Sequence, residues 1–242
     1  MLPLRDNIPT SKTPYVTYIF IAANVLVYFF WQKGGFSLSG PDSVHYQCQL
    51  LEWAATPDEL TGDKQALPAQ CGADDAPTWL TPFTAMFMHG GLLHLGGNML
   101  FLWIFGNNVE DAMGRAKFVA FYVLGGLAAF ALHVVTDLHS TTPTLGASGA
   151  IAAVLGGYAV LFPRARVVTV IFIVFFFTIL ELPALLVLGG WFLLQILSAS
   201  MDSTGGVAYF AHIGGFAFGL LAIRLFASKK RTKRQSDRLY TR

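Results

Sequence analysis

The sequence predicts an all-α membrane protein with several transmembrane helices. Only 12% of its 242 residues are charged, whereas soluble domains carry about 25%. Hydrophobic residues make up 54% of the chain, and its mean hydropathy is +0.54. A soluble fold of this length cannot keep so much apolar surface away from water. Apolar stretches close to the roughly 17–25 residues that cross a bilayer predict a polytopic bundle of six transmembrane helices.

The predicted spans follow an N-terminal arm of residues 1–14. They lie at residues 15–31, 83–105, 118–135, 145–162, 183–198 and 207–227. The fifth span is cut from a longer apolar stretch, because Pro183 suits the first turn of a helix. We therefore expect residues 167–180 to form an interfacial or hairpin-like segment. Residues 15–227 are the expected membrane domain, and residues 228–242 form a basic tail.

Basic residues gather on one side of this predicted bundle. The tail holds seven Lys or Arg residues, and the N-terminal arm and the connections between spans two and three and between spans four and five hold two each. An excess of Lys and Arg marks the cytoplasmic side, so we expect both termini in the cytoplasm and the acidic loop 33–79 outside. The expected location is the inner (cell) membrane of a bacterium. We expect the tail to contact anionic lipid, and we expect no nucleic-acid partner.

The outer loop holds both cysteines of the chain, Cys48 and Cys71. In an oxidising compartment they would pair and close a loop, and two free thiols are the other interpretation. Two cysteines are too few for a thiolate metal cluster, and His45, His133 and His139 share no ligand spacing. The sequence therefore predicts no metal site.

Polar residues inside the spans are costly in a bilayer and are functional candidates by default. The second span carries His94 and Asn98, which lie four residues apart on one helix face, with His89 just before them. The fourth span opens on Gly146-Ala147-Ser148-Gly149, and the sixth carries His212. Because these three spans run in the same direction, we expect the two span histidines and the serine at one depth below the outer surface.

Small residues indicate how the fourth and sixth spans approach each other. Ser148 and Ala152 share one face of the fourth span, and His212, Gly215 and Gly219 share a face of the sixth. Helices in lipid pack closely through such stripes, so the serine hydroxyl is expected near the histidine ring. Glycine-mediated packing with an incidental serine would explain the stripes alone, but it does not explain a histidine at the same depth.

A serine beside an imidazole base is an activated nucleophile for acyl transfer. Such chemistry also needs donors for the developing oxyanion, and the side chains of His94 and Asn98 and the backbone of the turn at Gly146 are the candidates. No Asp or Glu is placed to complete a triad, so the sequence predicts a dyad of Ser148 and His212. We expect His89 to be a structural residue at the junction of loop and helix.

These motifs resemble those of the rhomboid intramembrane serine proteases. Gly146-Ala147-Ser148-Gly149 is similar to the GxSG motif of the family, His89-x4-His94-x3-Asn98 to its second-helix pattern, and Ala211-His212-x2-Gly215-x3-Gly219 to its sixth-helix pattern. The resemblance covers about residues 15–227, in the minimal six-helix form. It implies cleavage of the transmembrane segments of other proteins near the outer face, without a cofactor.

The chain departs from the family pattern beneath the histidine. Some members have an aromatic residue four positions after the serine, whereas this chain has Ala152, so Tyr209 or Phe210 would have to fill the gap. Two other functions are alternatives to a protease. A catalytically silent rhomboid-like protein that binds membrane clients normally lacks the serine or the histidine. A small transporter would show inverted repeats or matched broken helices, which this sequence does not. The substrate and the oligomeric state stay open.

Overall fold

We describe the fold from a computed structural model, which describes the chain except residues 1, 63–66, 72–75, 174–175, 202–207 and 240–242. Most of the described residues are helical. The longer helices are α1 (Tyr15–Leu26), α2 (Val44–Trp53), α5 (Leu92–Phe101), α7 (Arg115–Thr136), α8 (Ser148–Leu161), α9 (Ala184–Met201), α10 (Tyr209–Phe226) and α11 (Lys229–Leu239). The shorter elements are α3 (Pro57–Thr61), α4 (Thr81–Thr84), α6 (Asn107–Met113), the π-helical turns η1 (Val27–Trp31) and η4 (Leu102–Gly106), and the 3-10 turns η2 (Ala69–Cys71) and η3 (Ala85–Phe87).

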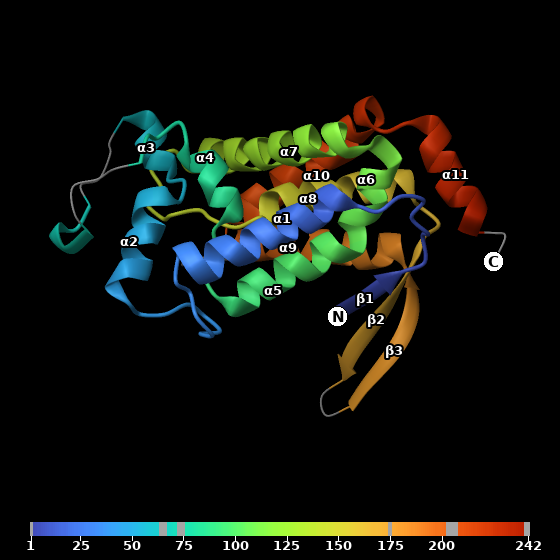
Figure 1. The fold of residues 1–242 in the computed structure, drawn as a ribbon, viewed down its shortest axis with the longest axis horizontal. Helices are drawn as coiled ribbons and strands as arrows, with labels where there is room; N and C mark the ends of the chain where they lie inside the picture. Colours follow the sequence, from blue (N-terminus) through green and yellow to red (C-terminus); the bar gives the residue numbers. More distant parts are fainter. Residues whose placement is uncertain (1, 63–66, 72–75, 174–175, 202–207, 240–242) are drawn as a thin grey trace.

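Helix α8 lies in the middle of the helical bundle and packs against α7 and α10 (Figure 1). Every residue of α8 from Gly149 to Ala159 is buried, because small residues on α10 let the two backbones approach. A Cβ atom at Gly215 would collide with the carbonyl oxygen of Gly149, and one at Gly219 would collide with that of Ala153. The predicted contact between the fourth and sixth spans is therefore present.

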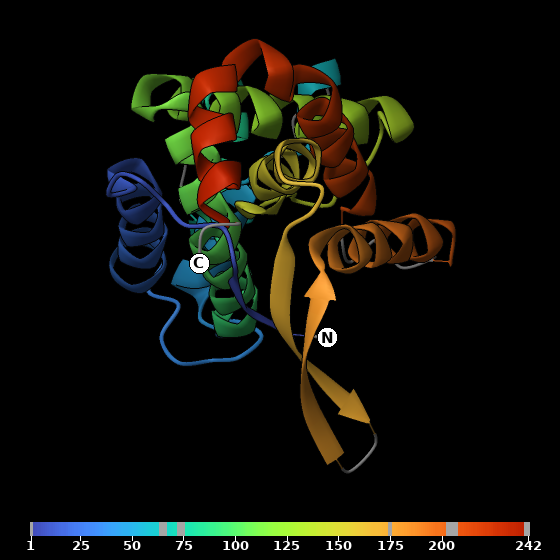
Figure 2. The same cartoon turned by 90° about the vertical axis from the view of Figure 1, so that its right-hand side faces the viewer.

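Three helices in the described part of the chain are long and apolar enough to cross a membrane: α7, α9 and α10. The helices Tyr15–Trp31 and Ser148–Leu161 are apolar but shorter. Helix α9 runs out to one side of the bundle (Figure 2) and exposes many leucines, among them Leu185, Leu186, Leu193 and Leu194. The chain thus has the helical membrane architecture that its composition predicts, and the count of six spans stays a prediction.

The second predicted span begins later than the sequence indicates. Residues 83–87 belong to the separate short elements α4 and η3, and α5 begins at Leu92. Its first two N–H groups donate to the carbonyl oxygens of Ser37 and Leu38 in the preceding loop, which satisfies donors that a helix end leaves free. Because the helix starts here, His89 lies in the loop before it, at the junction that the sequence predicts.

The described residues of the segment 167–180 belong to two antiparallel strands, which agrees with the hairpin-like form, one of the two predicted for this segment. The hairpin projects away from the bundle beside α9 (Figure 2). Since α9 begins at Ala184, directly after Pro183, the predicted start of the fifth helix is confirmed. The three strands form one antiparallel sheet in the order β1 (Leu2–Asp6), β2 (Arg166–Ile173) and β3 (Phe176–Pro183).

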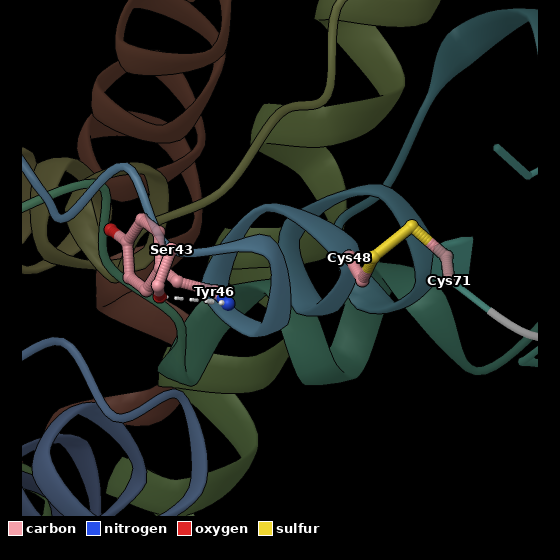
Figure 3. Close-up of a disulfide and its surroundings, with 4 residues drawn as sticks. All are labelled: Ser43, Tyr46, Cys48 and Cys71. Atoms are coloured by element: carbon pink, nitrogen blue, oxygen red, sulfur yellow. Dashed lines mark hydrogen bonds between the residues drawn. A yellow bond between two sulfur atoms is a disulfide. The ribbon is translucent and has the colours of Figure 1, made fainter.

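The two ends of the bundle carry different segments (Figure 1). Helices α2 and α3 lie at one end, and β1, α6 and α11 lie at the other. Cys48 of α2 and Cys71 form a disulfide (Figure 3), which cross-links the loop at the first end. Ser43 caps α2 there, since its Oγ accepts a hydrogen bond from the N–H of Tyr46.

Candidate active site

Ser148 and His212 lie side by side in the folded chain. The Oγ atom of Ser148 is 2.8 Å from Nε2 of His212, which is hydrogen-bond distance. Ser148 is the first residue of α8, and His212 lies in the first turn of α10. The close packing of α8 and α10 at this end brings the hydroxyl and the imidazole together.

Two residues of α9 complete the surroundings of the imidazole. The Oε1 atom of Gln195 lies 2.7 Å from Nδ1 of His212, and the ring centroid of Trp191 lies 5.8 Å from that of the histidine. The sequence interpretation missed both residues, and it placed Tyr209 or Phe210 where Trp191 lies. Gln195 carries the signal that singled out the other site residues, since it is polar within an apolar span.

Gly146 separates the serine from His94. Its φ of +120° is a conformation that side chains other than that of glycine rarely adopt. A Cβ atom here would lie 2.7 Å from Cε1 and 2.8 Å from Nε2 of His94. Nδ1 of His94 accepts a hydrogen bond from the N–H of Gly90 at 3.3 Å, so in the neutral ring the proton lies on Nε2. That N–H is therefore close to the turn that leads into Ser148.

Asn98 supplies a second side-chain donor in the same region. The residue is 8% exposed, and its Nδ2 has no hydrogen-bond partner within the described residues. It lines a cavity of about 710 Å³ together with His94, Ser148, Trp191 and His212. An unpaired buried donor costs about 1–3 kcal/mol, so an oxygen atom that entered the cavity and accepted from this amide would be stabilised.

The backbone of His89 ties the loop before α5 to its neighbours. Its carbonyl oxygen accepts hydrogen bonds from Nε2 of Gln32 and the hydroxyl of Tyr46, and its N–H donates to Oε1 of Gln32. Its ring packs edge-on against that of His94, with the centroids 5.1 Å apart. The hydrogen bonds are made by the backbone, and neither ring nitrogen has a hydrogen-bond partner within the described residues, so a structural role for this side chain stays a prediction.

The remaining predicted glycines shape the helix contacts around the serine. A Cβ atom at Gly149 would lie 2.7 Å from the Cβ of Ala129 on α7. Gly215 and Gly219 allow α10 to approach α8, as described above. These glycines place the two helices that carry the serine and the histidine.

Hydrogen bonds to other segments fix the chain just before Ser148. The N–H of Gly146 donates to the carbonyl oxygen of Ala85 at 2.8 Å. Ala55 and Thr144 form an isolated antiparallel bridge, in which each N–H donates to the carbonyl oxygen of the other. Ala55 and η3 therefore hold the turn that presents the serine. The N–H of Gly146 is already bonded to Ala85, so it is not the free oxyanion donor that the sequence predicts at this position.

The cavity brings together a serine hydroxyl, an imidazole and N–H donors, which are the kinds of group that acyl transfer through a serine requires. Within the described ranges, no group of three or more His, Cys, Asp or Glu side chains is arranged to hold a metal ion.

Comparison with known proteins shows which family the chain resembles. Residues 76–229 match the model of the Rhomboid domain family. The chain is 31% identical over 163 residues to Rhomboid protein 1, mitochondrial, of Saccharomyces cerevisiae, an alignment that covers 63% of this chain and 43% of that protein. It is 31% identical over 144 residues to the human Presenilin-associated rhomboid-like protein, mitochondrial, which covers 55% of this chain and 34% of that protein.

A bacterial relative is also similar. The chain is 28% identical over 143 residues to Rhomboid protease GluP of Bacillus subtilis, and the alignment covers 59% of this chain and 24% of that protein. The chain thus spans less than half the length of each of these relatives. The family model includes the turn at Gly146 and the helices that carry Asn98, Ser148 and His212. These matches show that the chain belongs to the rhomboid family.

Proposed function

We propose that this protein is an intramembrane serine endopeptidase that cuts the transmembrane segments of other membrane proteins. The observation that carries the proposal is the 2.8 Å contact between Oγ of Ser148 and Nε2 of His212, in a cavity that His94 and Asn98 also line. One relative bears the name of a rhomboid protease, and this supports the same reaction class.

In the proposed reaction, Nε2 of His212 takes the hydroxyl proton of Ser148 while Oγ bonds to the carbonyl carbon of the substrate peptide. The charge on the carbonyl oxygen is stabilised by Nε2–H of His94, the amide of Asn98 and N–H groups at the start of α8. The imidazolium then gives its proton to the leaving amine as the C–N bond breaks. A water molecule, deprotonated by the same nitrogen, hydrolyses the acyl ester and restores the serine.

We propose that six helical segments cross the membrane: α1 with η1, α5 with η4, α7, α8, α9 and α10. Residues 15–227 then form the membrane domain, with the loop 33–79 on the outer side. The excess of Lys and Arg at the other end of the bundle supports a cytoplasmic location for residues 1–14 and the tail 228–242. We propose the inner (cell) membrane of a bacterium as the location. GluP of Bacillus subtilis is a bacterial relative, whereas the two relatives of higher identity named above are mitochondrial by name. The substrates would meet the serine near the outer face, because α8 starts at the end where the outer loop lies.

The first prediction tests the dyad. Ser148→Ala and His212→Ala should each abolish cleavage of single-span substrates, because each removes one half of the proton transfer. The double variant should be little worse than either single variant, since the two groups act as one unit. The measurement is the cleavage rate with purified protein in lipid, with the cut mapped by mass spectrometry.

A fluorophosphonate probe provides the control. It should label the wild-type protein at Ser148 and fail to label Ser148→Ala. A catalytically silent protein that binds membrane clients, or a transporter, would show no such labelling. Cleavage by Ser148→Ala at a substantial rate would contradict the proposal and place the nucleophile elsewhere.

A further inference from the structure

Gln195 contacts the imidazole of His212 on the side away from Ser148. Its Oε1 atom lies 2.7 Å from Nδ1 of the histidine, and the serine lies 2.8 Å from Nε2. A carboxylate would occupy this position in a serine triad, and the sequence offers none here. The half-buried side-chain amide of Gln195, on the apolar helix α9, therefore lies where the carboxylate of a triad would lie.

The hydrogen bonds of Gln195 determine which of its side-chain atoms faces the histidine. Its Nε2 lies 3.5 Å from the carbonyl oxygen of Trp191, one turn earlier on α9. A carbonyl oxygen only accepts, so the amide nitrogen belongs on that side and Oε1 belongs on the side of His212. The amide oxygen also only accepts, so Nδ1 of His212 carries the proton. In a neutral ring this leaves Nε2 unprotonated where it faces Ser148.

We infer that Gln195 is a positioning residue that holds His212 in the tautomer able to accept the serine proton. It also stabilises the imidazolium that forms, since Nδ1–H becomes a donor from a charged ring. This inference rests on the proposed protease function and deepens it. It assigns to α9 a part in the chemistry that the predicted dyad gives only to α8 and α10.

Aromatic contacts fix the turn of α9 that carries this amide. The ring centroid of Trp191 lies 5.8 Å from that of His212 and 6.2 Å from that of Phe216. Phe192 stacks on Phe216 with a centroid separation of 4.4 Å. Trp191 therefore supplies an aromatic neighbour for the imidazole, and its carbonyl oxygen contacts the Gln195 amide.

The test compares three variants of the full-length protein in lipid. Gln195→Leu removes the acceptor at similar size, Gln195→Glu keeps an acceptor oxygen, and Leu194→Ala is the matched control, because Leu194 is 60% exposed on the same turn. We expect Gln195→Leu to lower kcat about 10- to 100-fold, the range that follows from losing a hydrogen bond to a charged group, while KM changes little. Gln195→Glu should recover most of the loss, and Leu194→Ala should match the wild type.

A second measurement does not depend on turnover. In ¹⁵N NMR of histidine-labelled protein, with the His212 signals assigned by their absence in His212→Ala, the wild type should show a proton on Nδ1. Gln195→Leu should shift the ring toward the other tautomer. A normal kcat in Gln195→Leu, or a tautomer that this substitution leaves unchanged, would overturn the inference. If the wild type neither cleaves substrates nor reacts with the probe, the protease proposal fails, and the tautomer still decides the role of Gln195.

Discussion

At the scale of single residues, substitution of Asn98 distinguishes a catalytic role of this side chain from a structural one. Its unpaired Nδ2 in the cavity predicts that it donates to the oxyanion. Such a donor acts chiefly in the transition state, so Asn98→Ala should lower kcat more than it raises KM. Removing one donor costs about 10²–10³ in rate, and we expect a loss near or below the lower limit, because His94 and backbone N–H groups remain. The measurement is kcat together with the melting temperature.

A second buried asparagine serves as the control for this prediction. Nδ2 of Asn24 donates to the carbonyl oxygen of Phe20 within α1, outside the cavity. Asn24→Ala should therefore lower the melting temperature and leave kcat unchanged. If Asn98→Ala behaves in the same way, Asn98 only joins helices and has no part in the reaction.

The residues with chemical groups were largely predictable from the sequence. Ser148, His212, His94 and Asn98 are polar residues in apolar spans. The alternation of span direction predicts the serine and the two histidines at one depth, with Asn98 one helical turn deeper. Gln195 was missed, because helical spacing does not reveal which neighbour will reach the far side of an imidazole. That contact depends on how α9 leans against α10, which is set by aromatic packing between helices.

At the scale of elements, starts of helices were less predictable than their cores. Hydropathy places an apolar span over residues 83–105, but the backbone breaks before Leu92, where a distant loop supplies acceptors for the first N–H groups. Similarly, α8 begins at Ser148 and not at residue 145, because the positive φ of Gly146 interrupts the chain. Both breaks depend on contacts far along the sequence, and hydropathy does not contain them.

At the scale of elements, we predict a membrane contact for the hairpin of β2 and β3. Its large apolar side chains are exposed, with Phe176 at 79% and Phe177 at 69%. Within the described residues, strand β1 pairs with β2 only as far as Val170, so the outer part of the hairpin has two strands, and an isolated two-stranded hairpin is only marginally stable in water. We expect its outer part to contact the lipid of the cytoplasmic leaflet, beside the exposed leucines of α9. A fluorophore on Phe176→Cys should be quenched by nitroxide-labelled lipids in nanodiscs and protected from iodide in the buffer.

Leu60→Cys is the matched control, since Leu60 is 47% exposed on α3, at the opposite end of the bundle (Figure 1). Its fluorophore should respond to iodide and not to the labelled lipids. Quenching of the label at position 176 by iodide alone would show that water covers the hairpin, and would remove it from the membrane.

At the scale of the whole molecule, one carboxyl group joins segments from the beginning, middle and end of the chain. Oδ2 of Asp6 accepts hydrogen bonds from Nδ2 of Asn108 and from the hydroxyl of Tyr158, each at 2.6 Å. The carbonyl oxygen of Asn108 in turn accepts from Nε2 of Gln235 on α11. The sequence gives no hint of this cluster, because its members share no motif and meet only through the packing of β1, α6, α8 and α11.

Burial raises the pKa of Asp6 from 3.8 to about 7, and the hydrogen bond from Tyr158 offsets only part of this effect. The folded protein therefore keeps a proton between about pH 4 and pH 7 that the unfolded chain has released. The stability from this group is complete below pH 4 and is lost as the pH rises to 7. Above pH 7 the folded state holds a largely buried charge without a basic partner among the contacts that raise or lower its pKa.

The last prediction follows from this loss of stability as the pH rises. Asp6→Asn removes the charge and keeps an oxygen that accepts from Tyr158 and Asn108, so the variant should melt at a higher temperature than the wild type at pH 8. For a chain of this size each kcal/mol corresponds to about 2–4 °C. At pH 4.5, where Asp6 is protonated in the folded protein, the difference should be small. The exposed Asp42→Asn is the control and should not change this difference between the two pH values. An equal gain for Asp6→Asn at both pH values, or a loss at pH 8, would mean that the carboxylate is stabilised where it lies and that the cluster tolerates its charge.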